Sequence, residues 1–224
     1  MNESLHQPPV LRTYFRSTAA YRVRMALNYK GVEHSLLPVN LLKGEHKEDA
    51  FLTHNPQGLI PTLEVGHEGL QSKRIITQSM AILEYLEEVY PNKPLLPANA
   101  LDRAAVRSLA QSIACDIHPL NNLRVLKYLV AELGTNEEDK LKWYHHWLHE
   151  GFNSLESQLA SLAGKFCLGD SPSLADVCLV PQVYNANRFE FCVSDFPLIH
   201  KINNHCLEIS EFANASPDKQ PDFV

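Results

Sequence analysis

Two hydroxyl residues lie where the sequence predicts that a strand turns directly into a helix. Leu11 to Phe15 alternate in the manner of a short strand rich in β-forming residues. Ser17 and Thr18 follow as candidate helix caps, and apolar residues then recur at helical spacing until Gly31. The first amides of a helix have no intrahelical partner, and the helix dipole is positive there. The turn could therefore hold an anion.

Two arginines, Arg16 and Arg22, flank this turn. A cation near the start of a helix is unfavourable by roughly 0.3–1 kcal/mol, so a bound anion would explain why both are tolerated. The alternative is that Ser17 and Thr18 only cap the helix and that both arginines are solvated. The turn by itself leaves both interpretations open.

A second helix start carries an amide and a hydroxyl, Gln78 and Ser79, directly after a short strand predicted at Lys73 to Thr77. Met80, Leu83, Leu86 and Tyr90 share one face of this helix, and Pro91 ends it. Its first turn could bind an anion in the same way as the first helix.

The elements that must position these residues form an α/β unit followed by helices. Strands are expected at 11–15, 34–39, 61–65 and 73–77, the third beginning at Pro61 after an unusual, cis peptide bond because proline cannot donate to a sheet. Turns are expected at 55–58 and 66–72. Beyond residue 100 the strand signals stop, and apolar residues at helical spacing predict helices over 101–133, over 137–163, from Ser173 onward and over 196–209. The first of these helices is expected to kink at Pro119. The sequence thus predicts an α/β domain over 11–91, a linker over 92–100 and an all-helical domain over 101–216, with a tail that fades out.

Composition excludes several classes of protein. The 224 residues carry a formal net charge of −6 without a block of lysine or arginine, which argues against a nucleic-acid partner. No apolar run approaches the length of a membrane span, and the first residues lack a signal core, so we expect no membrane partner. The five cysteines form no C-x-x-C pair, which favours a reducing cytoplasm. His145, His146 and His149 could pair on a metal, but no third ligand is nearby, so we expect no metal.

Five segments together resemble the glutathione transferase fold, a thioredoxin-like α/β N-terminal domain joined to an all-α C-terminal domain. Residues 17–24, Ser-Thr-Ala-Ala-Tyr-Arg-Val-Arg, resemble the Ser-Ser-Cys-x-x-Arg-x-Arg signature of the zeta class, the maleylacetoacetate isomerases. The resemblance continues through the segments 55–58, 78–88, 118–126 and 175–183. It extends over most of the chain between residues 11 and 210.

The resemblance implies glutathione as cofactor, with its sulfur beside Ser17 at the start of the first helix. Ile60, before cis-Pro61, would pair with the cysteinyl backbone of glutathione, and Gln78 with Ser79 would bind the γ-glutamyl carboxylate. The implied catalytic residues are Ser17, Thr18 and Arg22, and the residues implied to bind the dicarboxylate substrate are Arg16, Arg22 and Arg188. The full set implied to bind glutathione is Ser17, Thr18, Ala19, His46, Ile60, Pro61, Gln78, Ser79, His118, Asn122, Leu123 and Arg124.

The implied reaction is the isomerisation of maleylacetoacetate to fumarylacetoacetate in tyrosine and phenylalanine breakdown. Ala19 replaces the cysteine of the family signature, which removes a protein thiol but leaves a glutathione thiolate mechanism intact. Alternatives are a maleylpyruvate isomerase, a general glutathione S-transferase acting on small electrophiles, and a non-catalytic protein of the same fold. The family resemblance also implies a homodimer, for which the sequence itself offers only the long apolar helix predicted at 101–133.

Overall fold

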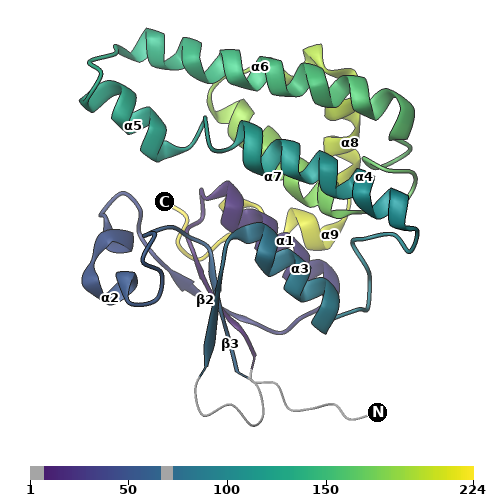
Figure 1. Ribbon diagram of the computed structural model, residues 1–224, viewed down its shortest axis with the longest axis horizontal. Helices are drawn as coiled ribbons and strands as arrows, with labels where there is room; N and C mark the ends of the chain where they lie inside the picture. Colours follow the sequence, from purple (N-terminus) through teal and green to yellow (C-terminus); the bar gives the residue numbers. More distant parts are fainter. Residues whose placement is uncertain (1–7, 67–72) are drawn as a thin grey trace. The chain divides into compact units, whose positions relative to one another are not determined.

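The computed structural model describes residues 8–66 and 73–224, which divide into two compact units (Figure 1). The first unit contains the described residues up to Pro94 together with Ser210–Val224, and the second is Leu95–Ile209. The boundary near residue 94 lies inside the expected linker, whose Leu95 and Leu96 are buried. The C-terminal segment belongs to the first unit, whereas we expected residues up to 216 to continue the helical domain.

The first unit is built on a four-stranded mixed sheet in the order β2-β1-β3-β4. The strands are β1 (Val10–Thr13), β2 (Ser35–Pro38), β3 (Thr62–Val65) and β4 (Arg74–Thr77). β1 pairs parallel to β2 and antiparallel to β3, and β3 pairs antiparallel to β4. The predicted order of strands and helices is confirmed. The expected hairpin at 66–72 falls mainly on residues 67–72, which lie outside the described residues.

Helices α1 (Thr18–Lys30) and α3 (Ser79–Val89) pack against each other beside the sheet (Figure 1). Gly31 ends α1 with a φ of 66°, as the sequence predicted, because glycine adopts the left-handed conformation without strain. The buried residues of α3 are Ser79, Ile82, Leu83 and Leu86, so Ile82 takes the core position that we assigned to Met80. At the far end of both helices, Lys30 Nζ lies 2.6 Å from Glu87 Oε1 in a pair almost fully removed from solvent.

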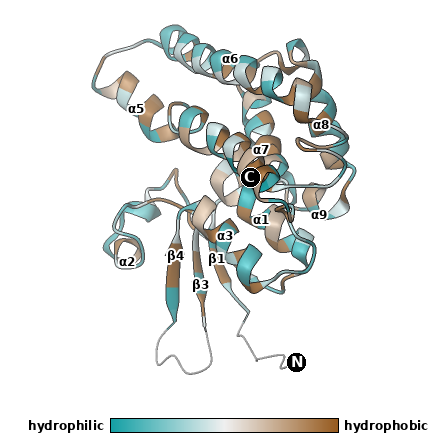
Figure 2. Cartoon of the chain, turned by 45° about the vertical axis from the view of Figure 1, so that its right-hand side comes forward, coloured by the Kyte–Doolittle hydropathy of each residue, from teal (hydrophilic) through white to brown (hydrophobic). Residues whose placement is uncertain are grey.

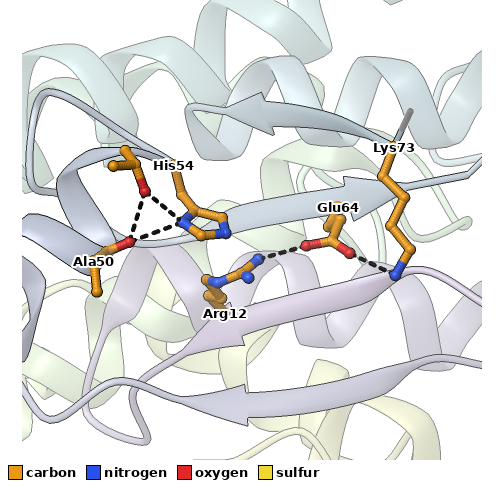
Figure 3. A network of polar contacts seen from close by, with 6 residues as sticks. Arg12, Ala50, His54, Glu64 and Lys73 are labelled. Carbon is orange, nitrogen blue, oxygen red and sulfur yellow. Dashed lines mark hydrogen bonds and ion pairs between the residues drawn. The ribbon is translucent and has the colours of Figure 1, made fainter. Parts of the chain in front are cut away.

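One charged network crosses the sheet (Figure 3). Arg12 on β1 and Lys73 before β4 both contact the carboxylate of Glu64 on β3, at 3.0 and 2.7 Å. The hydrogen bonds from Lys73 and then Arg12 hold the pKa of Glu64 below its usual value. Between β2 and β3 the chain forms the short helices η1 (Glu45–Lys47) and α2 (Asp49–Leu52), as expected for residues 41–54.

The C-terminal segment packs on the first unit, so the prediction of a fading tail is wrong. It forms α9 (Ser210–Ala213) and η4 (Pro217–Lys219), and the Phe212 side chain is buried. Asn28 Nδ2 on α1 donates to the backbone oxygen of Glu211 at 3.1 Å. Apolar burial and backbone hydrogen bonds therefore order a segment whose polar composition resembles that of a free terminus.

The second unit consists of helices throughout its described length. They are α4 (Ala100–Gln111), the π-helical η2 (Ser112–Ile117), α5 (Leu123–Ala131), α6 (Glu137–Leu162), α7 (Leu174–Arg188), η3 (Val193–Asp195) and α8 (Pro197–Leu207). Figure 2 shows hydrophilic and hydrophobic residues alternating along α6, which buries Tyr144, Leu148, Phe152, Leu155 and Leu159. No helix in residues 8–66 and 73–224 is long and apolar enough to cross a membrane.

The prediction of a single kinked helix over 101–133 is wrong, because the helix is interrupted. Helical structure stops after Ile117 and resumes at Leu123, and Asn122 caps the new helix by accepting from the Arg124 amide at 3.0 Å. Pro119 lacks the amide that a continuous helix needs, and the asparagine that follows favours a new helix start. Leu123 is 42% exposed as a result, although the periodicity placed it inward.

The start of α7 confirms the predicted capping box. Asp176 Oδ2 accepts from the Ser173 amide at 2.9 Å and from the Ser173 hydroxyl at 2.7 Å. Burial raises the pKa of Asp176 although these hydrogen bonds, and one from the Cys167 amide, act in the opposite direction. Asp176 is thus a structural residue that orders the core of the second unit.

Candidate functional site

The Ser17 side chain caps α1 and still has a proton to donate. Its Oγ accepts a hydrogen bond from the Ala20 amide at 3.2 Å, and its backbone oxygen accepts from Tyr21. A hydroxyl combines one donor with two acceptor lone pairs, so the cap uses a lone pair and leaves the O–H free to point elsewhere. Capping and donation to an anion are therefore compatible and are not alternatives. Thr18 is buried and is the first helical residue rather than a second cap.

The turn that leads to Ser17 is held by Arg24, a residue whose role could not be predicted from its sequence position. Arg24 is buried, and its guanidinium donates to Thr13 Oγ1 at 2.9 Å, to the Phe15 carbonyl at 3.1 Å and, at 3.4 Å, to the Tyr14 carbonyl. It also donates to the Ala215 carbonyl at 3.1 Å. The second arginine of the Arg-x-Arg pair thus joins the end of β1, the turn and the C-terminal segment.

The pairing register brings three candidate segments to one end of the sheet. Arg12 of β1 and Thr77 of β4 both lie opposite Thr62 of β3. The turn after β1, the step Ile60-Pro61 before β3 and the helix start after β4 therefore share this end. The Ile60-Pro61 bond is cis, as predicted.

His46 lies beside the turn that precedes this step. A Cβ atom added to Gly58 would stand 2.9 Å from the His46 carbonyl, and the φ of Gly58 is +59°, so glycine is required on both counts. The structure thus packs the backbone of His46 against the turn at 55–58.

The start of α3 is left without a side-chain cap. Gln78 has a φ of 70°, which is uncommon for a residue other than glycine, and its side chain makes no capping bond to the helix. Its Nε2 instead donates to Gln57 Oε1 at 2.8 Å. The first turn of α3 contains no acidic residue, and the same is true of α1. Neither helix start therefore offers an acidic side chain of its own to the positive end of the helix dipole.

Arg22 does not lie in solvent beside the turn, as one of the two sequence interpretations required. It is buried, and its Nη1 donates to Ser79 Oγ at 3.2 Å. The residue therefore links the interior of α1 to the first residue of α3. Arg16 is half-buried, with its guanidinium carbon 4.9 Å from the centre of the Phe15 ring. Ala19 occupies the second position of α1 and is half-buried.

The other candidate residues belong to the second unit. His118, Asn122, Leu123 and Arg124 follow one another through the break between η2 and α5, with His118 Nε2 3.4 Å from Asn122 Nδ2. Arg188 ends α7, is exposed, and donates to Asn185 Oδ1 at 2.9 Å. Asn185 in turn donates to the Tyr144 hydroxyl at 2.9 Å, and burial raises the pKa of that phenol. The structure thus fixes the direction of the Arg188 side chain through a buried pair.

Comparison with known proteins agrees with this fold. Residues 16–89 match the family model described as glutathione S-transferase, N-terminal domain. A probable maleylacetoacetate isomerase of Vibrio cholerae is 45% identical over 95% of this chain and 97% of its own. A bacterial maleylpyruvate isomerase of the zeta class, solved in its holo form, superposes with a TM-score of 0.90 and 42% identity, covering 96% of this chain and 100% of its own. The maleylacetoacetate isomerase of Methylobacterium extorquens AM1, solved with bound malonate and glutathione, gives a TM-score of 0.89 and 36% identity over 96% of this chain and 99% of its own.

The fold, the matched family model and these relatives define a glutathione transferase. Within that class, 45% identity over 95% of the chain identifies the family. The chain belongs to the zeta-class family of maleylacetoacetate isomerases.

Proposed function

We propose that the chain catalyses the glutathione-dependent cis–trans isomerisation of maleylacetoacetate to fumarylacetoacetate. The observation that carries the proposal is the pair of helix starts at one end of the sheet, one with the Ser17 hydroxyl and one without a side-chain cap from Gln78. These residues suit a ligand with a thiolate and a separate carboxylate, which is the chemistry of glutathione. When bound, glutathione supplies the thiolate that adds to the cis double bond and leaves again after rotation.

Some residues of the chain would bind glutathione, and others would stabilise the charge of its thiolate. Ser17 would donate its free hydroxyl proton to the sulfur, and the helix dipole of α1 would further favour the thiolate. Ile60 would offer its amide and carbonyl to the peptide backbone of the ligand, in the manner of an added strand. The amides at the start of α3 would bind the γ-glutamyl carboxylate, with Gln78 and Ser79 placed by Gln57 and Arg22. No protein thiol is needed, which agrees with Ala19 at the family's cysteine position.

The second substrate is a dicarboxylate in this proposal, and the family resemblance assigns Arg16, Arg22 and Arg188 to it. The bound malonate of the Methylobacterium extorquens relative, itself a dicarboxylate, supports this substrate class. The bacterial maleylpyruvate isomerase at 42% identity favours maleylpyruvate as the second candidate substrate.

The test compares Ser17→Ala with Ser17→Thr in the purified chain. Loss of one donor to developing charge typically costs about 10²–10³ in rate, and we expect the lower end for Ser17→Ala because the donor also stabilises the ground-state thiolate. Ser17→Ala should also raise the pKa of the bound glutathione thiol, followed as thiolate absorbance in a pH titration. Ser17→Thr keeps the hydroxyl and should retain most of the rate.

Isomerisation of maleylacetoacetate and of maleylpyruvate should be followed separately, with and without glutathione. A higher kcat/KM for maleylpyruvate would replace the proposed substrate with the second candidate. Turnover without glutathione, or conjugation of electrophiles without isomerisation of either compound, would contradict the proposal.

We also infer a homodimer in a reducing cytoplasm. The inference rests on the family resemblance and on free cysteines in the described parts of the chain. The long helix predicted at 101–133 was the only support for a dimer in the sequence itself, and the structure breaks that helix. Light scattering should give about twice the chain mass of 25.3 kDa, and a value near the chain mass at micromolar concentration would contradict the inference.

A further inference from the structure

The C-terminal segment contacts the turn that delivers Ser17. Asp222 Oδ2 accepts a hydrogen bond from the Phe15 amide at 2.9 Å. The Phe223 ring meets the Phe15 ring edge-on, with the centroids 5.5 Å apart and the planes at 89°. Two successive residues at the end of the chain therefore contact a single residue of the turn.

The backbone of Phe15 is held from both sides. Its amide binds Asp222, and its carbonyl accepts from Arg24 Nη2 at 3.1 Å. The Ser17 amide closes the turn by donating to the Tyr14 carbonyl at 2.9 Å. Only Arg16 separates Phe15 from Ser17, so the orientation of the Phe15 peptide sets the direction in which the Ser17 side chain leaves the turn.

An ordered segment brings Asp222 to this position. The Gln220 side chain is buried and donates to the Ser216 carbonyl at 2.8 Å, and Arg24 donates to the Ala215 carbonyl. The second carboxylate oxygen, Asp222 Oδ1, is buried and has no hydrogen-bond partner within residues 8–66 and 73–224. A buried acceptor without a partner costs free energy, so stability alone does not explain a carboxylate here.

We propose that Asp222 is a positioning residue for the isomerase reaction, which fixes the Phe15 amide and thereby aims the Ser17 hydroxyl at the glutathione sulfur. Asp222 acts through the turn and does not itself touch the ligand. The inference rests on the proposed function of Ser17. Under this proposal, the C-terminal residues help to position Ser17 at the start of α1.

The experiment uses the full chain with Asp222→Ala, Asp222→Asn and a matched control, Asp218→Ala. Asparagine keeps an acceptor oxygen without the charge, and Asp218 is an exposed acid of the same segment that binds Ser216 instead. Four quantities are measured: hydrogen exchange of the Phe15 amide, the pKa of the bound glutathione thiol, kcat, and KM for glutathione.

Asp222→Ala should speed Phe15 amide exchange by about tenfold or more, because a hydrogen bond to a charged acceptor is lost. It should also raise the thiol pKa and lower kcat by about 5–20-fold, less than direct loss of a donor would, with KM for glutathione within about twofold. Asp222→Asn should restore most of each change, and Asp218→Ala should match the wild type. If Asp222→Ala does not fold, Asp222→Gln, which displaces the acceptor, takes its place in every measurement.

Unchanged Phe15 exchange in Asp222→Ala would overturn the proposed anchoring. Faster exchange with unchanged thiol pKa and kcat would also overturn the proposal, because Asp222 would then be only a structural contact. Failure of the proposed function is a separate result, since it would appear as a wild-type chain that neither binds glutathione nor isomerises. Even in that case, exchange of the Phe15 amide tests whether Asp222 anchors it.

Discussion

Replacing Arg24 tests whether the buried guanidinium organises the first unit. Arg24 makes three hydrogen bonds of 3.1 Å or less, to Thr13 Oγ1 and to the carbonyls of Phe15 and Ala215, and a longer one to Tyr14. A hydrogen bond to a charged group contributes about 1.5–3 kcal/mol, so three independent bonds would total about 4.5–9 kcal/mol. Removing the guanidinium also removes its desolvation cost, and methionine fills part of the space. We therefore expect Arg24→Met to lower the free energy of unfolding by about 3–5 kcal/mol, as for other broken buried polar networks.

Arg24→Lys separates charge from geometry. The guanidinium of arginine donates from three nitrogens that point in different directions, whereas the ammonium of lysine has a single nitrogen. Lysine should therefore recover less than half of the lost free energy of unfolding. Arg74→Met, at an exposed arginine on β4 of the same unit, should change stability by about 0.5 kcal/mol at most.

Urea unfolding followed by far-UV circular dichroism measures these differences. Trp143 and Trp147 are the only tryptophans of the sequence and lie in the second unit, so their fluorescence reports that unit separately. The circular dichroism transition of Arg24→Met should move to lower urea more than the fluorescence transition does. A loss below about 1 kcal/mol, or full recovery by lysine, would refute the reasoning, because the network would then carry little of the free energy that its bonds imply.

Three further predictions concern the start of α3 and two ion pairs of the first unit. Gln78→Ala combined with Ser79→Ala should weaken glutathione binding by a few kcal/mol at most, given about 1.5–3 kcal/mol for each charged hydrogen bond, and calorimetry showing unchanged affinity would exclude this carboxylate site. Glu87→Gln should destabilise the chain by about 3 kcal/mol or more because it leaves the buried Lys30 ammonium without its charged partner, and thermal unfolding with an unchanged midpoint would contradict this. The hydrogen bond from Lys93, and then that from Ser210, lower the pKa of Glu211 from 4.5 to about 2, so the ionised carboxylate stabilises the folded chain above about pH 4.5 and this contribution is lost as pH falls through about 2. The pair is partly exposed, so Glu211→Gln should cost about 1 kcal/mol at neutral pH and progressively less as pH falls through about 2, and a cost that does not change with pH would contradict the assignment.

Local sequence signals were sufficient to predict the elements of the first unit from β1 to α3, but not its C-terminal segment. Ser17 and Gly31 bound α1 because capping and left-handed φ values depend on single residues. Pro61 marked the start of β3 because the absence of an amide is likewise a property of one residue. The capping box of Ser173 and Asp176 was predictable for the same reason.

Contacts between distant segments were not predictable from local patterns. Arg22 and Arg24 look alike in sequence, but one reaches Ser79 and the other reaches Ala215, and only the folded chain distinguishes them. Asp222 carries no local signal at all, since an acid among polar residues near a terminus is usually solvated. The break after Ile117 was underestimated because the apolar spacing continues across Pro119, and periodicity does not distinguish a kink from an interruption.

The placement of the C-terminal segment has a consequence for biosynthesis. A ribosome delivers the α/β portion first, and N-terminal domains generally fold while the rest of the chain is still being made. Here the Phe15 amide and the Arg24 guanidinium find partners 207 and 191 residues later. Until residues 215–222 have been made, the nascent α/β portion must therefore lack these bonds. Completion of the Ser17 turn thus has to wait until the helices between Leu95 and Ile209 have already been synthesised.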